Sequence, residues 1–188
     1  DRTTTYRLLA TLEEEGYVSR NPLNDLYFVL DEVLNLSRGY QHKNAIMPVI
    51  SKELERLVSQ IIWPSDLMTF EGGYMVVRES THRSSAYSIY RGMVGRRLPL
   101  LFSAAGRALL AVSSPKQRGM FIETARHMGN LELTQAELAP RLEQLDADYA
   151  KRGYTWSVGA LDAPLSAIAL PVNLGGGVMG AVNIMFFS

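Results

Sequence analysis

The sequence predicts an α+β fold in which helices flank an antiparallel sheet, and three observations lead to this prediction. Apolar residues recur at helical spacing in some segments and form short β-rich runs between turn residues in others. Several of the strand-like runs follow one another directly along the chain, as strands do in antiparallel sheets. Hydrophobic residues make up 47% of the 188 positions, which is enough for one sizeable core and a small satellite domain.

The composition narrows the functional classes. The 19 basic and 19 acidic residues cancel, so any contact with nucleic acid must come from a local basic cluster. The chain has no cysteine, which excludes disulfides, thiolate nucleophiles and cysteine-ligated zinc. Because the sequence shows neither a signal peptide nor a long apolar span, we expect a soluble cytoplasmic protein without membrane contact. The sequence starts inside a motif and ends on a strand-like run, so we expect both ends to be truncated.

The first segment predicts a helix over Arg2–Glu15, with its leucines on one face. Gly16 stands where a helix end needs a residue that tolerates a positive φ. Tyr17 is therefore expected to pack back on Leu12, as in a Schellman cap.

Two short strands and a linker are predicted next. Tyr17–Arg20 and Leu26–Leu30 flank a turn-rich stretch and predict a hairpin, so residues 1–30 read as a helix followed by a two-stranded wing. Asp31–Ala45 combines apolar residues with a polar stretch, which is typical of a short helix that links two domains. We place the domain boundary at the end of this linker, with residues 46–188 as the second domain.

The second domain begins with a helix and a group of strands. Apolar residues at helical spacing over Ile46–Leu57 predict a helix that ends before Pro64. Ser65–Phe70 and Tyr74–Ser80 lie on either side of a Glu-Gly-Gly turn and predict a hairpin. Ser85–Tyr90 is predicted as a third strand, and three successive strands imply an antiparallel sheet.

Three more helices and two strands complete the second domain. The small residues Ser103–Gly106 begin a helix, and Pro115–Thr124 predicts another. Thr134 and Glu137 form a capping-box pattern that begins a long helix, and Gly153 ends it. The last strands are predicted at Ser166–Val172 and Val178–Phe187, joined by Gly175–Gly177.

The first helix carries its charges in an unfavourable order. Arg2 and Arg7 lie at its start and three glutamates at its end, which costs a few tenths of a kcal/mol, roughly, for each charge against the helix dipole. A phosphate backbone beside the first turns would use these cations, and threonine hydroxyls can reach phosphates and base edges. The alternative is a solvated amphipathic helix with no ligand.

The segment RTTTYRLLATLEEEGYVSR resembles the recognition helix and first wing strand of IclR-type transcriptional regulators. In that family two helices precede this one. The resemblance implies an operator in double-stranded DNA as a partner, with Arg20 and the wing turn near its backbone. The residues implied in the major groove are Arg2, Thr3, Thr4, Thr5, Tyr6 and Arg7.

A second stretch, GRRLPLLFSAAGRALLA, is similar to the GAF-like effector-binding domain of the same family. A helix that begins with small residues from Ser103 to Gly106 leaves backbone N–H groups open to a ligand carboxylate. We therefore expect an enclosed cavity beside this helix start that is large enough for an organic anion. The alternative is that alanine and glycine here only permit tight packing between helix and sheet.

The resemblance also implies which other residues line the effector site. They are Tyr87, Tyr90, Leu98, Ala104, Ala105, Ser157, Leu165, Ala167, Asn183 and Met185. Family members that bind small keto acids commonly have an acidic residue at the position of Ser157, a cysteine at that of Ala167, and serines at those of Asn183 and Met185. A less polar site favours an aromatic or arylalkyl carboxylic acid, because unmatched buried polar groups are costly.

Three further stretches, WPSDLMTF, MVVRESTHR and MVGRRLPLL, resemble the family's regulators of hydroxyphenylpropionate catabolism, which points to the same class of ligand. Arginines usually lie on a solvated surface, but some offer alternative partners for the carboxylate. These are Arg78, Arg91, Arg96 and Arg97.

The sequence offers little support for an enzyme. The histidines His42, His82 and His127 are too scattered for a metal site, and no cofactor is expected. Ser103 lacks the pattern of a nucleophile elbow and fits a helix N-cap, although a hydrolase using it is a third hypothesis. Asp66, Glu71, Glu79 and Asp162 are acids without a paired geometry.

Our first hypothesis is a homodimeric or homotetrameric regulator whose effector changes the disposition of its DNA-reading heads. The alternative is a stand-alone GAF-like binding module in which the first helix serves only dimerisation.

Overall fold

The computed structural model describes residues 1–36, 47–160, 164–173 and 179–188, and the chain forms two compact units, Asp1–Ala45 and Ile46–Ser188. None of the described helices is long and apolar enough to cross a membrane.

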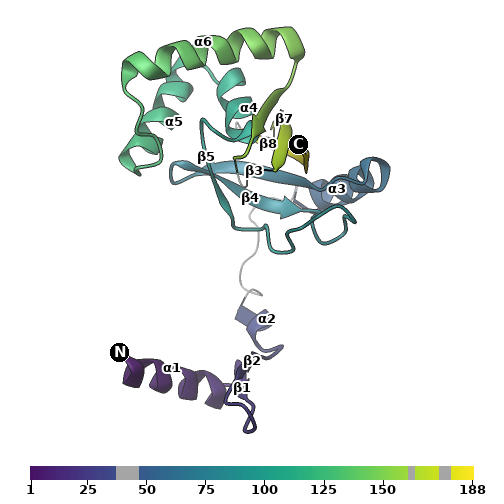
Figure 1. Cartoon of the computed structure of the whole chain (residues 1–188), viewed down its shortest axis with the longest axis vertical. Helices are drawn as coiled ribbons and strands as arrows, with labels where there is room; N and C mark the ends of the chain where they lie inside the picture. The colour runs from purple at the N-terminus through teal and green to yellow at the C-terminus, as the bar shows by residue number, and fades with distance from the viewer. Residues whose placement is uncertain (37–46, 161–163, 174–178) are drawn as a thin grey trace. The chain divides into compact units, whose positions relative to one another are not determined.

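The N-terminal unit contains a helix, a hairpin and a short second helix, α1 (Arg2–Glu14), β1 (Val18–Arg20), β2 (Tyr27–Val29) and α2 (Val33–Leu36) (Figure 1). The predicted cap at the end of α1 is confirmed. Gly16 has a φ of 76°, and the Tyr17 N–H donates to the Leu12 carbonyl at 2.8 Å. The Gly16 N–H donates to the Glu13 carbonyl at 3.1 Å, which completes the Schellman motif.

Only the first part of the predicted linker helix lies among the described residues. There, α2 is a helix of four residues. The remainder of the predicted Asp31–Ala45 helix, from residue 37 onward, lies outside the described residues.

The C-terminal unit is built on one antiparallel sheet of six strands in the order β5-β4-β3-β8-β7-β6. The α+β prediction is thereby confirmed. The strands are β3 (Ser65–Glu71), β4 (Tyr74–Ser80), β5 (Arg97–Pro99), β6 (Thr155–Val158), β7 (Leu165–Asn173) and β8 (Met179–Phe187). The helices are α3 (Met47–Ile61), α4 (Ala104–Val112), α5 (Pro115–His127) and α6 (Gln135–Arg152).

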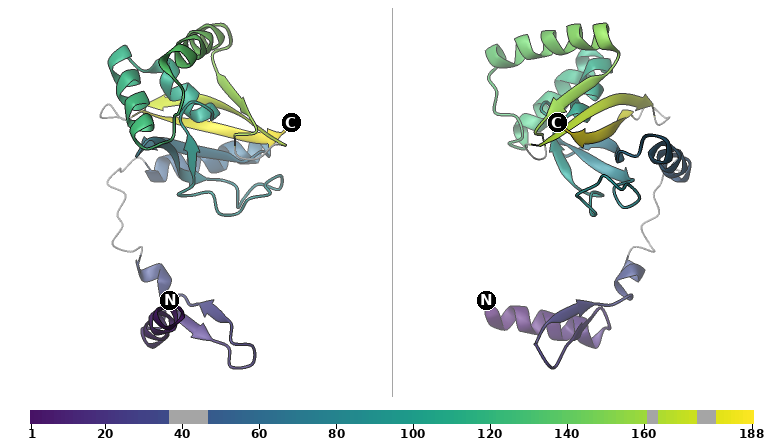
Figure 2. Two further views of the ribbon diagram at one scale, coloured as in Figure 1. Left: turned by 60° about the vertical axis from the view of Figure 1, so that its left-hand side comes forward. Right: turned by 45° about the vertical axis from the view of Figure 1, so that its right-hand side comes forward.

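Helices cover both faces of this sheet (Figures 1 and 2). The main core lies between the sheet and the layer of α4, α5 and α6, with Leu109 and Met68 at its centre. A smaller core lies on the opposite face, where Leu54 of α3 packs against Leu67 of β3. Neighbouring residues of β3 therefore face different layers, as strand geometry requires.

The helix boundaries predicted from capping residues are confirmed. Ser103 caps α4, and Thr134 and Glu137 form the reciprocal capping box of α6. Gly153 ends α6 in the left-handed conformation, with a φ of 75°. Val178 and Gly175–Gly177, predicted at the last strand and its turn, lie outside the described residues.

The predicted third strand at Ser85–Tyr90 is wrong. This segment is irregular, and the strand beside β4 is instead β5. Serine side chains bond the backbone that a sheet would otherwise pair. Ser85 Oγ donates to the Ile62 carbonyl at 2.7 Å, and Ser88 Oγ donates to the Tyr90 carbonyl at 2.5 Å.

Candidate functional site

The start of α4 offers one free hydrogen-bond donor. Ser103 Oγ accepts from the Gly106 N–H at 3.1 Å and donates to the Pro99 carbonyl at 2.7 Å. The Ala104 N–H donates to Ser157 Oγ on β6 at 3.1 Å. Among the described residues, the Ala105 N–H has no hydrogen-bond acceptor. The predicted array of open amides is thus reduced to a single group.

Gly106 serves packing at this point. A Cβ added there would lie 1.8 Å from the Leu100 carbonyl oxygen, so only glycine lets the helix approach that backbone. Gly106 does not line the cavity described next. Its position agrees with the packing alternative considered for the small residues.

One cavity lies between the start of α4 and five strands, and nine of the predicted effector-site residues line it. These are Leu98, Ser103, Ala104, Ala105, Ser157, Leu165, Ala167, Asn183 and Met185. The sequence did not predict the other three lining residues, Met68, Ala160 and Ser166. Residues from six separate elements thus converge on one space.

The cavity is much smaller than we expected. Its volume is about 20 Å³, which holds a single water molecule and no organic anion. The small side chains at the start of α4 pack closely against the sheet and leave little free volume. The expectation of a cavity large enough for an organic anion is therefore wrong for this structure.

Tyr87 and Tyr90 lie outside this cavity and line a neighbouring crevice. Tyr87 is half exposed and packs against Trp63, with ring centroids 4.9 Å apart. Leu165 and Met185 line both spaces and therefore separate them.

One residue that lines the cavity, Asn183, belongs to a group of buried polar atoms without partners. Asn183 Oδ1, both carboxyl oxygens of Asp66 and His82 Nε2 are buried without a hydrogen-bond partner. Asp66 and Asn183 are paired across β3 and β8, and His82 Nε2 lies 3.5 Å from Asp66 Oδ2. Native interiors rarely leave such atoms unpaired, so they mark a place for a water or a ligand. The sequence named Asp66 and His82 but gave no reason to bring them together.

Ser88, His82 and Asp66 have the composition of a catalytic triad but not its hydrogen-bond direction. Ser88 Oγ donates its proton to the Tyr90 carbonyl and so accepts from His82 Nδ1, which is 2.6 Å away. An activated serine would donate to the histidine instead. The Ser103 proton is likewise held by a carbonyl.

Metal ligands are not grouped in the part of the chain that the structure describes, where no three His, Asp or Glu side chains come together. His42 and Asp162 lie outside that part.

The four alternative arginines lie away from the cavity. Arg78 bonds Thr69 and Glu71. Arg91 donates to backbone carbonyls of the loop after β4. Arg96 and Arg97 lie over tyrosine rings, at 4.7 and 5.8 Å from the centroids.

The N-terminal unit exposes all six residues predicted to enter the major groove. Arg2, Thr5, Tyr6 and Arg20 line a groove between α1 and the hairpin. Thr3 and Arg7 lie on the adjacent face of α1 with Arg2 and Tyr6, whereas Thr4 lines neither face. Arg20 pairs with Asp25 at 2.8 Å, and this carboxylate raises the pKa of Arg20.

Comparison with known proteins assigns both units. Residues 39–188 match the family model of the bacterial transcriptional regulator IclR C-terminal domain, and residues 1–22 match that of the IclR helix-turn-helix domain. The chain belongs to the IclR family.

IclR proteins are DNA-binding transcriptional regulators with a C-terminal effector-binding domain, not a family of enzymes. The chain is 26% identical to the HTH-type transcriptional regulator KdgR of Escherichia coli over 189 residues, covering 98% of this chain and 70% of KdgR.

Solved structures show the same fold. The Thermotoga maritima IclR structure has a TM-score of 0.75 at 17% identity, covering 100% of this chain and 75% of that one. An IclR homologue from Microbacterium hydrocarbonoxydans, solved in complex with 4-hydroxybenzoate, has a TM-score of 0.68 at 20% identity, covering 100% and 76%.

Proposed function

We propose that this regulator senses a hydroxylated aromatic carboxylic acid at the cavity beside α4. The observation that carries the proposal is the pair of unmatched polar groups on the cavity wall. The Ala105 N–H is a free donor at the positive end of a helix, and Asn183 Oδ1 is a buried free acceptor. A ligand that presents a carboxylate to the first and a hydroxyl to the second satisfies both.

Binding such an acid requires the cavity to enlarge. Sites for drug-sized ligands span roughly 300–1,000 Å³. Met185 divides the cavity from the crevice of Tyr87 and Tyr90, and methionine is the side chain that most easily changes its packing. Displacement of Met185 joins the two spaces and brings both tyrosines beside the ligand. The complex of an IclR homologue with 4-hydroxybenzoate and the resemblance to hydroxyphenylpropionate regulators support this ligand class.

The proposal assigns DNA reading to the exposed face of α1. The residues are Arg2, Thr3, Thr4, Thr5, Tyr6 and Arg7, with Arg20 at the backbone. The protein acts in the cytoplasm as a homodimer or homotetramer, so that paired heads contact an operator with two half-sites.

Thermal unfolding with candidate acids tests the ligand class. A ligand at about one hundred times its Kd stabilises the protein by roughly 2.7 kcal/mol. We expect 4-hydroxybenzoate or 3-(hydroxyphenyl)propionate to raise the Tm, and pyruvate to leave it unchanged.

Two variants test the assignment to the cavity. Ala105→Pro removes the free N–H at a first-turn position that tolerates proline, and Asn183→Leu removes the acceptor. Both are expected to reduce the Tm shift while remaining folded, because the free donor or acceptor in the cavity is lost. An undiminished shift in both variants would show that the acid binds elsewhere.

A further inference from the structure

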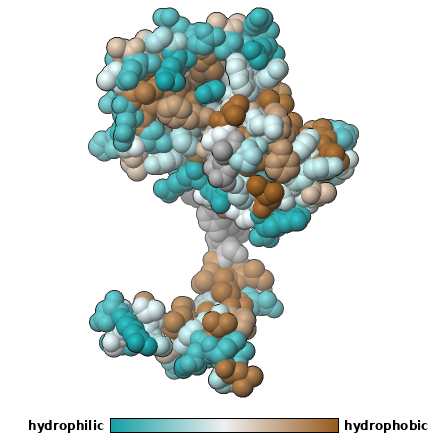
Figure 3. Space-filling view, in the orientation of Figure 1, coloured by the Kyte–Doolittle hydropathy of each residue, from teal (hydrophilic) through white to brown (hydrophobic). Residues whose placement is uncertain are grey.

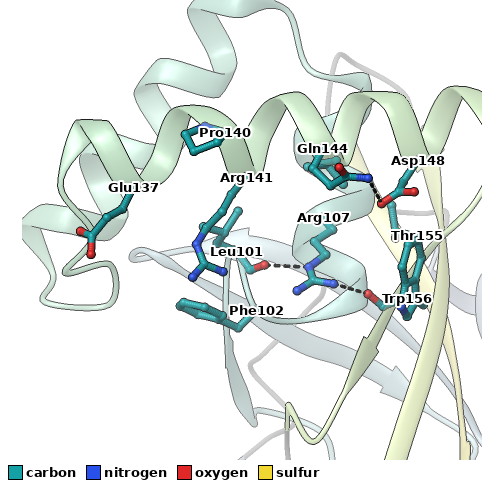
Figure 4. A pocket seen from close by; sticks show the side chains of 11 residues that line it. Leu101, Phe102, Arg107, Glu137, Pro140, Arg141, Gln144, Asp148, Thr155 and Trp156 are labelled. Carbon is teal, nitrogen blue, oxygen red and sulfur yellow. Dashed lines mark hydrogen bonds between the residues drawn. The ribbon is translucent and has the colours of Figure 1, made fainter.

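A second, larger space opens on the other side of α4 and shares no residue with the small cavity. This cleft has a volume of about 530 Å³ and lies between α4, α6 and β6 (Figure 4). Its size is in the range of sites that hold small organic ligands. The residues that line it include Leu101, Phe102, Arg107, Arg141, Leu145 and Trp156.

Arg107 is fixed at the back of this cleft. Its Nε donates to the Leu101 carbonyl at 2.9 Å and one terminal nitrogen to the Trp156 carbonyl at 2.6 Å. Burial lowers the pKa of Arg107, and the positive charge of Arg141 lowers it further. Neutral carbonyls hold the guanidinium in place, and within the described residues it forms no ion pair.

Arg141 extends from α6 into the same cleft (Figure 4). It forms no hydrogen bond or ion pair with any described residue, although two carboxylates line the cleft. Glu137 is engaged by the backbone N–H and hydroxyl of Thr134, and Asp148 accepts from Gln144 at 2.9 Å. These carboxylates lie eleven positions apart on α6, about 16 Å along its axis, so they mark the ends of the cleft and the two arginines its middle.

Apolar and aromatic surface accompanies these cations. Phe102 is 39% exposed, and Trp156 lies opposite it across the cleft with the Arg152 guanidinium 4.1 Å from its ring centroid. In the space-filling view, apolar surface is visible below the hydrophilic rim that α6 forms (Figure 3). Two guanidinium groups that form no close ion pair among the described residues, beside the exposed ring of Phe102 and the half-buried ring of Trp156, match a flat organic anion.

We propose that this cleft is a second ligand site, which binds an aromatic carboxylate with its carboxylate between Arg107 and Arg141 and its ring against Phe102 and Trp156. The site is distinct from the cavity under the start of α4, and neither proposal depends on the other.

Tryptophan fluorescence isolates the cleft, because the chain has only two tryptophans. Trp63 lies in the aromatic cluster with Tyr87, so in a Trp63→Phe background the emission reports Trp156 alone. With benzoate as the probe, we expect saturable quenching. Arg141→Gln should raise the benzoate Kd about tenfold or more, as expected for the loss of a charged hydrogen-bond partner. Lys151→Gln removes a positive charge from the same helix outside the cleft and should leave the Kd unchanged.

Acetate and the inner-cavity variant complete the test. Acetate should bind far more weakly than benzoate if the rings contribute, and Asn183→Leu should leave the Trp156 response intact. Absence of quenching at millimolar benzoate, equal effects of Arg141→Gln and Lys151→Gln, or equal binding of acetate would each overturn the proposal. A smaller thermal shift in Asn183→Leu with quenching retained would separate the two sites.

Discussion

At the scale of single residues, the glycine at the start of α4 has the clearest consequence. Gly106→Ala places a Cβ 1.8 Å from the Leu100 carbonyl oxygen, and the backbone must move to relieve this clash. We expect a loss of about 1–3 kcal/mol or more in the free energy of unfolding, as for other overpacked cores. Denaturant unfolding measures it.

Gly119 provides a matched control within α5. A Cβ there meets nothing within 4 Å, so Gly119→Ala should stabilise the protein by about 0.5–1 kcal/mol. Equal effects of the two substitutions would contradict the packing role of Gly106.

The unpartnered oxygen of Asn183 makes an opposite prediction. Asn183→Leu keeps the number and branching of the side-chain heavy atoms and removes a buried acceptor, so the ligand-free protein should gain about 1 kcal/mol in unfolding free energy. Asn183→Asp should destabilise the protein, because it places a second carboxyl beside Asp66. A destabilised leucine variant, measured by urea unfolding, would mean that this oxygen already has a partner.

At the residue level, the sequence grouped positions that follow from a motif but not those that depend on packing. Family resemblance located Ser157, Ala167 and Asn183 on one cavity wall. It could not show that Ser157 Oγ binds the Ala104 amide, or that close packing leaves only about 20 Å³. The meeting of Asp66 and His82 depends on strand pairing and a loop path that no local pattern encodes.

At the scale of elements, the capping box of α6 predicts a pH dependence. Hydrogen bonds from Thr134 lower the pKa of Glu137. A carboxyl group whose pKa is lower in the folded than in the unfolded protein stabilises the fold when it is ionised. This stabilisation is fully present above the unfolded-state pKa of about 4.3 and is lost as the pH falls through the folded-state pKa. We expect the stability difference between wild type and Glu137→Gln to favour wild type at pH 7 and to vanish in acid. Thermal unfolding between neutral and acidic pH measures this difference, and a difference independent of pH would refute the prediction.

The helices were predicted better than the strands, and the reason is local. Caps such as Thr134 with Glu137, or Gly153, lie within the helix's own sequence. The edge strands β5 and β6 are only three and four residues long, and each acquires its strand geometry from a single neighbour. Ser85–Tyr90 has a β-like composition, but its serines bond the backbone locally. Amino-acid composition alone therefore does not distinguish a short edge strand from an irregular segment such as Ser85–Tyr90.

At the scale of the whole molecule, the proposed DNA contacts predict a salt dependence. Each phosphate contact that is lost reduces the slope of log K against log salt by about 1. Arg7→Gln in the intact regulator should lower this slope, whereas Lys52→Gln on α3 of the other unit should not. Band-shift titrations over a salt series measure both. Identical slopes would show that Arg7 makes no phosphate contact, and an absence of DNA binding would favour the stand-alone binding module.

Transmission between the units is testable through the predicted linker Asp31–Ala45. A flexible glycine insert there should leave effector affinity unchanged and reduce the effector's influence on operator affinity, which is typically about 5- to 150-fold in allosteric proteins. Parallel measurements of ligand binding and DNA binding separate these effects. An unaltered response would show that this segment does not carry the signal.

The edge strand β6 holds the first turn of α4 through hydrogen bonds on three successive residues. Thr155 Oγ1 donates to the Ala104 carbonyl at 2.7 Å, Ser157 Oγ accepts the Ala104 amide, and Arg107 reaches the Trp156 carbonyl. A ligand in the cavity or in the cleft contacts residues of β6, and among the described strands β7 alone pairs with β6. Deuterium uptake at the β6 amides therefore reports ligand occupancy of the cavity and of the cleft. Two ligands that displace β6 in opposite directions will exclude one another without direct contact.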